Sequence, residues 1–486
     1  MIALSEVNGL DLMVNSLIAL ALVLAPVTMW HALLYKRDPR AAMGWIGVCL
    51  LFPIIGPALY FLFGINRIHH RAQLWRDGAH QRRFVDFERG EEPLSEIPCY
   101  GKVQNEFSPL IRATYALTGL PLLEGNRVVI LRNGEQAFPA MLDAINGAER
   151  SVDLSTYIFE SNASGGTFAE ALYGAQSRGA TVRVIIDGMG DLYSWPRISS
   201  RLRRRGIRVE RFHPPRLMPV LPGFNLRNHR KLLLVDGQIA FTGGMNLGDR
   251  HLVAESANKK KTADIHFQFQ GPIVAQLTAG FTQTWQLASG RVAKAGSTEP
   301  SECGDSRCRV IVDGPDMNLD KLSHVLMAAI AQAKSSIRIM TPYFLPPREM
   351  LTALQTAALR GVVVTLVLPE KNNLPYVHWA MRNMLWELLY YNVRVVYQPP
   401  PFNHSKLFLV DGQYLLIGSA NLDSRSLRLN YELSVEIYDS LLAVELEQEF
   451  ERRVAGGVEL GLSDLDGRSL LSRSRDALCW LFSPYL

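Results

Sequence analysis

Two long apolar runs near the N-terminus precede a chain of mixed polarity. Residues 12–35 contain only a few polar side chains, and residues 41–63 form a second uncharged run that prolines interrupt. Each run is long enough to cross a bilayer as a helix, which takes about 20 residues. Only the charged segment 36–40 separates them. The pattern predicts a transmembrane helical hairpin over residues 1–65, with a buried helix pair of a soluble protein as the alternative.

After a charged linker punctuated by proline and glycine, 66–123, the hydrophobic positions mark short strands that alternate with helices. Continuous apolar runs predict strands buried on both faces, and periodic runs predict helices. The first series of expected elements is strand 127–131, helix 135–148, strand 151–159, helix 167–178 and strand 182–187. The second series is strand 309–312, helix 320–334, strand 336–343, helix 349–360 and strand 362–368. This alternation predicts an α/β fold.

The two series are copies of one unit, because their junctions match. The matching segments are 148–152 (AERSV) with 333–337 (AKSSI), and 178–182 (RGATV) with 360–364 (RGVVV). A duplication predicts two tandem domains, here 124–298 and 299–486, in a pseudo-two-fold arrangement. We expect the active site on the axis between them, with one motif supplied by each copy.

Each copy also carries one polar motif. Residues 228–237 are Asn-His-Arg-Lys-Leu-Leu-Leu-Val-Asp-Gly, and residues 403–412 are Asn-His-Ser-Lys-Leu-Phe-Leu-Val-Asp-Gly. A glycine-containing tail follows each motif at one common offset, Gly-Gly-Met-Asn-Leu from position 243 and Gly-Ser-Ala-Asn-Leu from position 418. A single such pattern arises by chance, but two copies with matching tails indicate a shared function.

Strand geometry sorts the motif residues by face. Side chains alternate along a strand, so the histidine and lysine of each motif share one face. The aspartate points to the opposite face, where Asp-Gly signals a hairpin turn, and we expect it to be structural. A return strand then brings the tail asparagine back towards the histidine. The residues expected to meet are His229, Lys231 and Asn246 in the first copy, and His404, Lys406 and Asn421 in the second.

The paired motifs resemble those of the phospholipase D superfamily. The whole chain is similar to the bacterial cardiolipin synthases, which are two-copy members with an N-terminal membrane hairpin. Three further segments carry this resemblance: 57–64, 341–344 and the C-terminal 481–486. The catalytic motif residues that it implies are His229, Lys231, Asp236, His404, Lys406 and Asp411. Within this set, strand geometry assigns the two aspartates to structure.

The resemblance also implies an acidic partner that orients each histidine and fixes its tautomer. The matching acidic residues downstream of the motifs are Asp264 in the first copy and Glu432 in the second. We expect each carboxylate to hold the histidine of its own copy, so that Asp264 serves His229 and Glu432 serves His404.

The motif side chains suit attack on a phosphodiester. Charge builds up on the non-bridging phosphate oxygens in such a reaction. Four motif side chains can bind these oxygens: Lys231, Asn246, Lys406 and Asn421. No set of carboxylate, histidine or cysteine ligands accompanies the motifs, so we expect neither a metal ion nor another cofactor. The histidines suit double displacement through a phosphohistidine, with His229 as nucleophile and His404 as acid and base.

By the same resemblance, a phosphatidyl group passes from one phosphatidylglycerol to the terminal hydroxyl of another, which yields cardiolipin and glycerol. Lipid hydrolysis, or transfer to a different alcohol, is an alternative for the same site. A nuclease of the superfamily is a more distant alternative, which the membrane hairpin and the lack of an arginine and aromatic face disfavour. A non-catalytic membrane scaffold is disfavoured by two complete motifs.

Composition bears on location and partners. The net charge of +5 is diffuse, which suits an anionic membrane surface and does not suggest nucleic acid. The five scattered cysteines imply no disulfide framework and favour a reducing compartment. Basic residues after the second apolar run favour catalytic domains on the cytoplasmic side of a multi-pass protein of the bacterial inner membrane. The oligomeric state is left open.

Two inserts separate the repeat cores from their motifs. The first contains a proline-rich apolar loop, 217–224, which we interpret as an entrance for acyl chains at the membrane interface. The second carries aromatic and methionine side chains at roughly helical spacing between positions 376 and 391. Core packing and an apolar entrance are both open interpretations of this stripe.

Overall fold

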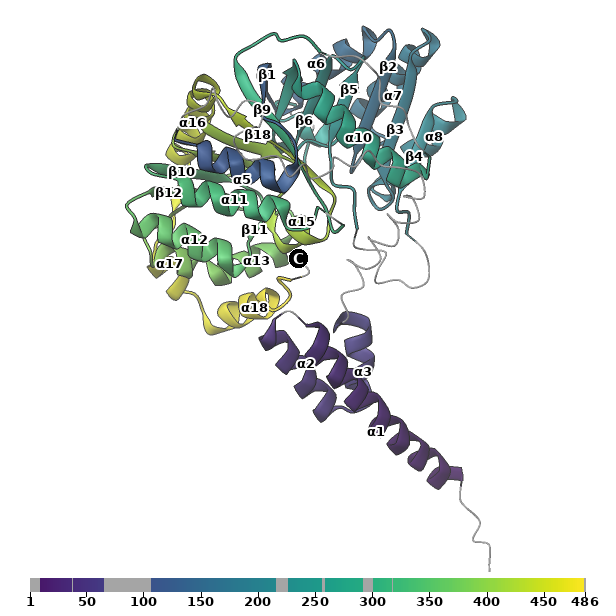
Figure 1. Ribbon diagram of the computed structural model, residues 1–486, viewed down its shortest axis with the longest axis vertical. Coiled ribbons are helices and arrows are strands. Elements are labelled where there is room, and N and C mark those ends of the chain that lie inside the picture. Colours follow the sequence, from purple (N-terminus) through teal and green to yellow (C-terminus); the bar gives the residue numbers. More distant parts are fainter. Residues whose placement is uncertain are drawn as a thin grey trace, which may run out of the picture. The chain divides into compact units, whose positions relative to one another are not determined.

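The computed structural model describes residues 9–36, 38–64, 106–215, 226–255, 258–291, 300–316 and 318–484 (Figure 1). The chain forms two compact units, Met1–Arg71 and Ala72–Leu486. Both copies of the repeat fall within the second unit, and the predicted boundaries after residues 65, 123 and 298 stay predictions. The proline-rich loop at 217–224 lies outside the described residues.

The first unit begins with a helix, α1 (Gly9–Tyr35), whose stretch Met13–Tyr35 is long and apolar enough to cross a membrane. The following helix, α2 (Pro39–Leu51), is shorter, and Asp38 caps its N-terminus by accepting a hydrogen bond from the backbone N–H of Arg40. The chain then continues as α3 (Ile55–Leu59) and a π-helical turn (Tyr60–Gly64). The second arm of the predicted hairpin is thus divided, because a proline at position 53 cannot continue the backbone hydrogen bonding.

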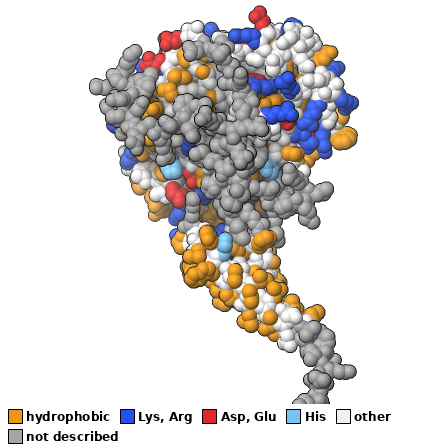
Figure 2. Space-filling model, turned by 45° about the vertical axis from the view of Figure 1, so that its right-hand side comes forward, with side chains coloured by type: hydrophobic (Ala, Val, Ile, Leu, Met, Phe, Trp, Pro, Cys, Tyr) orange, Lys and Arg blue, Asp and Glu red, His pale blue; other side chains and the backbone are white. Residues whose placement is uncertain are grey.

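The helices of the first unit pack on one another through small and polar side chains. Ala32, Cys49 and Tyr60 form a buried cluster, and the Nδ1 atom of His31 lies 2.9 Å from the Tyr60 hydroxyl. The face of this unit that Figure 2 shows is mostly apolar, and Leu22 is 71% exposed. An apolar surface on a unit whose first helix is long enough to span a bilayer is typical of membrane-associated segments.

The second unit contains the predicted alternation of strands and helices. The elements before and within the first copy are α5 (Ser108–Thr118), β1 (Leu123–Arg132), α6 (Asn133–Asn146), β2 (Ser151–Thr156), α7 (Ala163–Ser177), β3 (Thr181–Asp187), α8 (Ile198–Arg204), β4 (Arg208–Phe212), β5 (Leu232–Val235), β6 (Ile239–Gly243), β7 (Thr262–Ala263), β8 (Ile265–Gln270) and α10 (Ile273–Ser289).

The second copy repeats this series and then extends it. Its elements are β9 (Ser306–Asp313), α11 (Lys321–Gln332), β10 (Ser336–Met340), β11 (Phe344–Leu345), α12 (Arg348–Leu359), β12 (Val363–Pro369), α13 (Pro375–Met384), α14 (Trp386–Leu389), β13 (Arg394–Gln398), β14 (Phe402–Asn403), β15 (Leu407–Val410), β16 (Tyr414–Gly418), β17 (Leu422–Asp423), α15 (Ser424–Arg428), β18 (Glu432–Tyr438), α16 (Ser440–Ala455), β19 (Val458–Glu459), α17 (Leu462–Asp466) and α18 (Leu470–Trp480).

One 15-stranded sheet passes through both copies, in the order β19-β13-β12-β10-β15-β16-β18-β9-β1-β8-β6-β5-β2-β3-β4. The first strands of the two copies, β9 and β1, pair antiparallel at its centre, with Leu123 opposite Cys308 and Asn126 opposite Ser306. From this pair outwards, each half has the same strand order. The sheet therefore confirms the predicted α/β fold and the pseudo-two-fold arrangement of the copies.

Helices cover both faces of each half-sheet (Figure 1). Val182 and Val184 of β3 belong to the core formed with α6 and α7. Arg183 points to the opposite face, where its guanidinium lies 5.2 Å from the ring centre of Phe281 on α10. The alternation of side chains along β3 thus places α10 on the face opposite α6 and α7.

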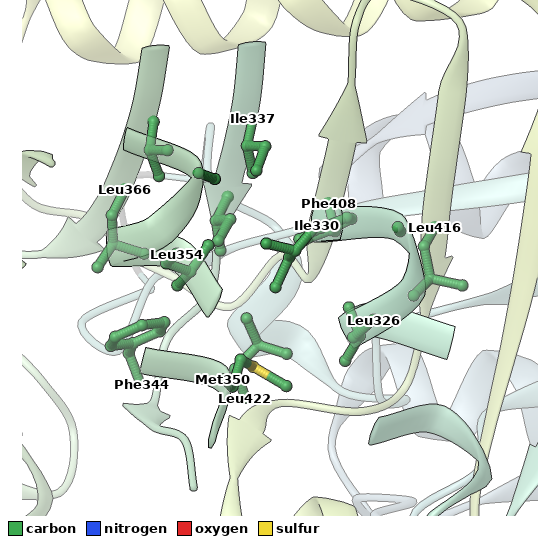
Figure 3. Close-up of a cluster of buried hydrophobic side chains, with 14 of the residues drawn as sticks. Leu326, Ile330, Ile337, Phe344, Met350, Leu354, Leu366, Phe408, Leu416 and Leu422 are labelled. Carbon is green, nitrogen blue, oxygen red and sulfur yellow. The ribbon is translucent and has the colours of Figure 1, made fainter. Parts of the chain in front are cut away.

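The largest core cluster lies in the second copy, between the sheet and helices α11, α12 and α13. Figure 3 shows its centre, where Leu326 and Ile330 of α11 and Leu354 of α12 face Ile337 of β10 and Phe408 of β15. Burial of such side chains contributes about 1.5–3 kcal/mol each to folding. The strand that follows the second histidine is therefore fixed on one side by the main core.

The aromatic and methionine stripe of the second insert contains both buried and exposed side chains. Met384 is buried in the core of the second copy. Tyr376, Trp386 and Tyr390 are 45%, 50% and 67% exposed. Core packing explains the first of these residues, and the other three lie at the surface.

Each motif strand ends in an aspartate turn, as strand geometry predicts. Asp236 and Asp411 both adopt left-handed backbone conformations, with φ of 53° and 51°. The carboxylate of Asp236 accepts hydrogen bonds from the backbone N–H groups of Glu149, Arg150 and Ser151 at 2.9, 2.8 and 2.7 Å. Partial burial acts to raise the pKa of Asp236, but these three donors hold it below its ordinary value. The carboxylate thus fastens the turn to the start of β2.

We expect Asp411→Ala to destabilise the protein without removing its chemistry. Asp411 accepts hydrogen bonds from the backbone N–H groups of residues 334, 335 and 336, each at 2.8 Å. Loss of these acceptors should cost about 2 kcal/mol and, in a unit of this size, lower the thermal unfolding midpoint by about 2 °C. The matched control is Asp466→Ala on α17. Loss of turnover in fully folded Asp411→Ala protein would show instead that this carboxylate is catalytic.

Candidate active site

The segments that lead into the two motif strands pair across the copies. Strand β14, just before His404, pairs in parallel with β7 of the first copy, and the His404 N–H donates to the Ala263 carbonyl at 2.7 Å. In the other direction, Asn228 bridges to Tyr431, and the His229 N–H donates to the Tyr431 carbonyl at 3.0 Å. Each histidine thus enters its strand beside the backbone that precedes the acidic residue of the other copy.

As a result, each histidine is held by the carboxylate of the opposite copy. The Nδ1 atom of His229 lies 2.9 and 3.0 Å from the two carboxylate oxygens of Glu432. The Nδ1 atom of His404 lies 3.1 Å from one oxygen of Asp264. The expectation that each carboxylate serves its own copy is therefore wrong, because spacing along the sequence does not reveal that the lead-in segments cross.

These contacts determine which ring nitrogen is available. Burial acts to raise the pKa of Glu432, but its contacts with His229 hold it below the ordinary value, so the carboxylate is ionised and can only accept. The Nδ1 atom of His229 then carries the proton, and Nε2 retains its lone pair. Burial lowers the pKa of His229 to about 4, although Glu432 acts to raise it, so the ring is neutral at physiological pH. Burial also lowers the pKa of His404, well below its ordinary value.

The two lysines lie beside the histidines and are almost completely buried. Lys231 donates to the carbonyl oxygen of His229 at 2.6 Å, and Lys406 donates to that of His404 at 2.5 Å. Burial lowers the pKa of Lys231 to about 7 and that of Lys406 to about 8. Each ammonium also acts to lower the pKa of the other histidine, which shows that the four groups form one electrostatic cluster.

The tail asparagines are each anchored through one atom. The side-chain oxygen of Asn246 accepts from the backbone N–H of Ile158 at 3.2 Å, which leaves its NH2 group for a ligand. The NH2 group of Asn421 lies 3.2 Å from the Ser426 hydroxyl, and its buried oxygen has no partner among the described residues. A half-turn of the Asn421 amide would let Ser426 donate to the oxygen and would present the NH2 group as in Asn246.

The two histidine–carboxylate pairs differ at one aligned position, Gly244 and Ser419. The Ser419 hydroxyl donates to Glu432 at 2.5 Å. A side chain at position 244 would meet the carboxylate oxygens of Asp264 at 2.7 and 2.8 Å and the carbonyl of His404 at 2.9 Å. Only glycine therefore fits beside Asp264, whereas the serine adds a hydrogen bond to Glu432.

Aromatic rings flank both histidines. The ring of Tyr157 lies edge-on to His229 with centroids 5.3 Å apart, and the Lys231 ammonium lies 5.6 Å from the same ring centre. Tyr343 and Phe402 lie 6.4 and 6.1 Å from the ring of His404. Such rings exclude water and position the imidazoles. Sequence reasoning missed Tyr157 and Ser419, although both lie within recognised segments: Tyr157 is in the predicted strand 151–159, and Ser419 is in the second motif tail.

The remaining motif residues are placed outside this cluster. Asp236 and Asp411 lie at the opposite ends of β5 and β15 from the histidines, as strand geometry predicts for structural carboxylates. In the part of the chain that the structure describes, no group of three or more histidine, cysteine, aspartate or glutamate side chains has the arrangement of a metal site. The cluster therefore consists of two histidines, two lysines, two asparagines and two carboxylates.

Comparison with known proteins identifies this arrangement. A family profile described as "Cardiolipin synthase, PLD-like domain" matches residues 141–285 and 326–454. A second profile, "Phospholipase_D-nuclease N-terminal", matches residues 23–64. Cardiolipin synthase 1 of Bacillus cereus is 30% identical, over 93% of this chain and 90% of its own length. Cardiolipin synthase A of Proteus mirabilis is 29% identical, over 96% of each chain.

A solved structure shares the fold. Phosphatidylserine synthase of Haemophilus influenzae superposes with a TM-score of 0.61 at 15% identity, and the match covers 78% of this chain and 100% of that one. At this identity the likeness concerns the fold alone. The profile matches and the near-complete alignment with the B. cereus relative carry the assignment. The chain belongs to the cardiolipin synthase family of phospholipase D-like phosphatidyltransferases.

Proposed function

We propose that this enzyme transfers a phosphatidyl group from one phosphatidylglycerol to the terminal hydroxyl of a second one, releasing glycerol and forming cardiolipin. The observation that carries the proposal is the pair of histidines, His229 and His404, each held at Nδ1 by a carboxylate and flanked by a lysine. Two such imidazoles on either side of a phosphorus atom suit a nucleophile and an acid–base catalyst.

In the first half-reaction, Nε2 of His229 attacks phosphorus, and the bond between phosphorus and the headgroup glycerol oxygen breaks. His404, protonated at Nε2, gives its proton to the leaving oxygen, and glycerol departs. The product is a phosphatidyl group bound to His229. Lys231, Lys406 and the tail asparagines neutralise the charge that develops on the non-bridging oxygens.

In the second half-reaction, the terminal hydroxyl of another phosphatidylglycerol attacks the phosphohistidine. His404 takes the hydroxyl proton at Nε2, the new phosphorus–oxygen bond forms, and the phosphorus–nitrogen bond to His229 breaks. One phosphodiester is lost and one is made, so no nucleotide is consumed. Both histidines return to their starting states.

The role of His404 as an acid requires a proton that the free site does not hold. Burial and the neighbouring lysines keep the pKa of His404 well below its ordinary value. A bound phosphodiester anion offsets the lysine charge and favours the protonated ring. We infer that binding of the lipid headgroup and protonation of His404 occur together.

The assignment of His229 as nucleophile rests on its carboxylate. The phosphohistidine ring carries positive charge while its Nδ1–H faces Glu432. That carboxylate contacts the ring through both oxygens and accepts a further hydrogen bond from Ser419. Glu432 is therefore a better-stabilised counter-charge than Asp264. It contacts the histidine that would carry the phosphatidyl group and with it a positive charge.

For location, we propose a multi-pass protein of the bacterial inner membrane with its catalytic domains on the cytoplasmic side. The spanning stretch Met13–Tyr35 and the N-terminal profile match over 23–64 support the membrane part. The basic residues that follow the second apolar run support the cytoplasmic side.

The first test is lipid analysis after membranes that carry the enzyme are incubated with labelled phosphatidylglycerol, without added metal ion or nucleotide. We expect cardiolipin and free glycerol in equal amounts, and a rate at least about 1,000-fold lower in His404→Ala. His324→Ala on the exposed surface of α11 is the matched control. Phosphatidic acid as the sole product would make the enzyme a hydrolase and overturn the transfer proposal.

A second experiment separates nucleophile from acid. A phosphatidyl ester of p-nitrophenol has a leaving group that needs no proton, so its first half-reaction does not require His404. We expect His404→Ala to release one equivalent of p-nitrophenol in a burst and to retain the phosphatidyl group. His229→Ala should give no burst. A burst from His229→Ala alone would reverse the two roles.

The pH dependence should follow the lysines. Burial lowers the pKa of Lys231 to about 7 and that of Lys406 to about 8, and a lysine is charged only below its pKa. The value of kcat/KM for phosphatidylglycerol should therefore fall as pH rises through this range. Lys231→Arg keeps its charge, so the first fall should move up towards the pKa of Lys406. An unchanged profile in Lys231→Arg would contradict this account.

A further inference from the structure

The last helix of the chain, α18, has an inverted polarity. Its large apolar side chains point outwards: Leu470 is 78% exposed, Leu471 85% and Leu478 60%. Leu481 and Phe482, just beyond the helix, are 64% and 57% exposed. Leu471 and Leu478 are seven residues apart and Leu478 and Leu481 are three, so these three leucines share one face, which Leu470 and Phe482 extend on either side. A surface helix in water normally buries such a face.

The orientation of α18 is fixed by a buried ionic cluster on its inner side. Asp476 is fully buried and accepts hydrogen bonds from Arg382 of α13 at 2.7 Å, from Arg468 at 2.5 Å and from Arg475 at 2.8 Å. The guanidinium of Arg475 also lies 4.3 Å from the ring centre of Trp379. A rotation that buried the leucines would break these ion pairs and leave an uncompensated buried charge.

The charge around the apolar face indicates the chemistry of its partner. Asp476 is the one carboxylate within α18, and the arginines around it compensate its charge. Arg473 adds a further positive charge on the same helix. A partner with an apolar layer beneath an anionic one would complement this surface. The interface of an anionic phospholipid bilayer has this composition.

We propose that α18 docks the catalytic unit on an anionic bilayer, with its outward leucine face in the interfacial layer and Arg473 at the phosphates. This inference rests on the proposed function, because docking would bring the active site to its lipid substrate. A physical connection to the active site exists through α13, which packs against both α18 and β11. Just before α13, Asn373 accepts a hydrogen bond from Tyr343, whose ring flanks His404, at 2.8 Å.

The first test is photo-crosslinking in the full-length protein, reconstituted in vesicles of labelled phosphatidylglycerol. A benzoylphenylalanine replaces Leu471, or Leu441 as a control, which is an equally exposed leucine on α16, 84% exposed. The background is His404→Ala, so that the lipid is not turned over and failure of the proposed reaction does not affect the outcome. We expect labelled lipid to attach at position 471 at least tenfold more than at position 441.

Each other outcome overturns the proposal. Crosslinks to a second copy would make α18 an oligomer contact, and crosslinks within the same chain would show that another segment covers it. Equal or absent lipid labelling at the two positions would show that the face does not enter the interface.

A second measurement compares turnover in two lipid environments. We expect the double variant Leu471→Asp and Leu478→Asp to lose about tenfold in rate on phosphatidylglycerol bilayers, but to keep its rate on the same lipid dispersed in detergent micelles. Leu441→Asp should behave as wild type in both. An equal loss in bilayers and micelles would show a structural role of α18 within the catalytic unit and would contradict docking.

Discussion

The exchange of carboxylates between the two copies is the constraint on which the rest of the structure depends. His229 is held by Glu432 and His404 by Asp264, so neither copy can orient its own histidine. The continuous sheet joins the two copies at β1 and β9. The crossed lead-in segments then bring each histidine to the carboxylate of the other copy. The two copies therefore form one active site together, because each copy alone would have a histidine without the carboxylate that orients it.

The same exchange accounts for the electrostatics of the site. Two lysines and two histidines are almost fully buried, and burial of charge is unfavourable by several kcal/mol for each ion. Glu432 and Asp264 offset part of this cost. Burial nevertheless lowers the pKa of Lys231 to about 7 and that of Lys406 to about 8. The free site is therefore short of negative charge. A phosphodiester anion supplies that charge, and the site is preorganised for the oxygens on which charge develops in the transition state.

Local sequence patterns predicted many features of the fold and of the site, because these features depend on residues that are close together in the sequence. Alternation placed each histidine and lysine on one face and each aspartate in a turn, and the duplicated junctions predicted the paired halves. The carboxylate exchange depends on contacts between residues about 140 and 200 positions apart, for which one sequence offers no signal. The division of the second apolar run depends on the proline at position 53, after which a new helix begins at Ile55. The outward face of α18 depends on Asp476, whose burial no helical pattern reveals.

The different roles proposed for the two histidines agree with the near-symmetry of the copies. The strands, turns and lysines are duplicated, so the differences lie where the copies diverge. Ser419 adds a donor to Glu432, whereas the aligned Gly244 leaves no room for one beside Asp264. The Lys406 ammonium lies 3.0 Å from Nδ1 of His404, a contact that disfavours a second proton on that ring until an anion is bound. In the proposed mechanism, Glu432 is thus the permanent counter-charge for a covalent cation on His229, and binding of the substrate controls the proton affinity of His404.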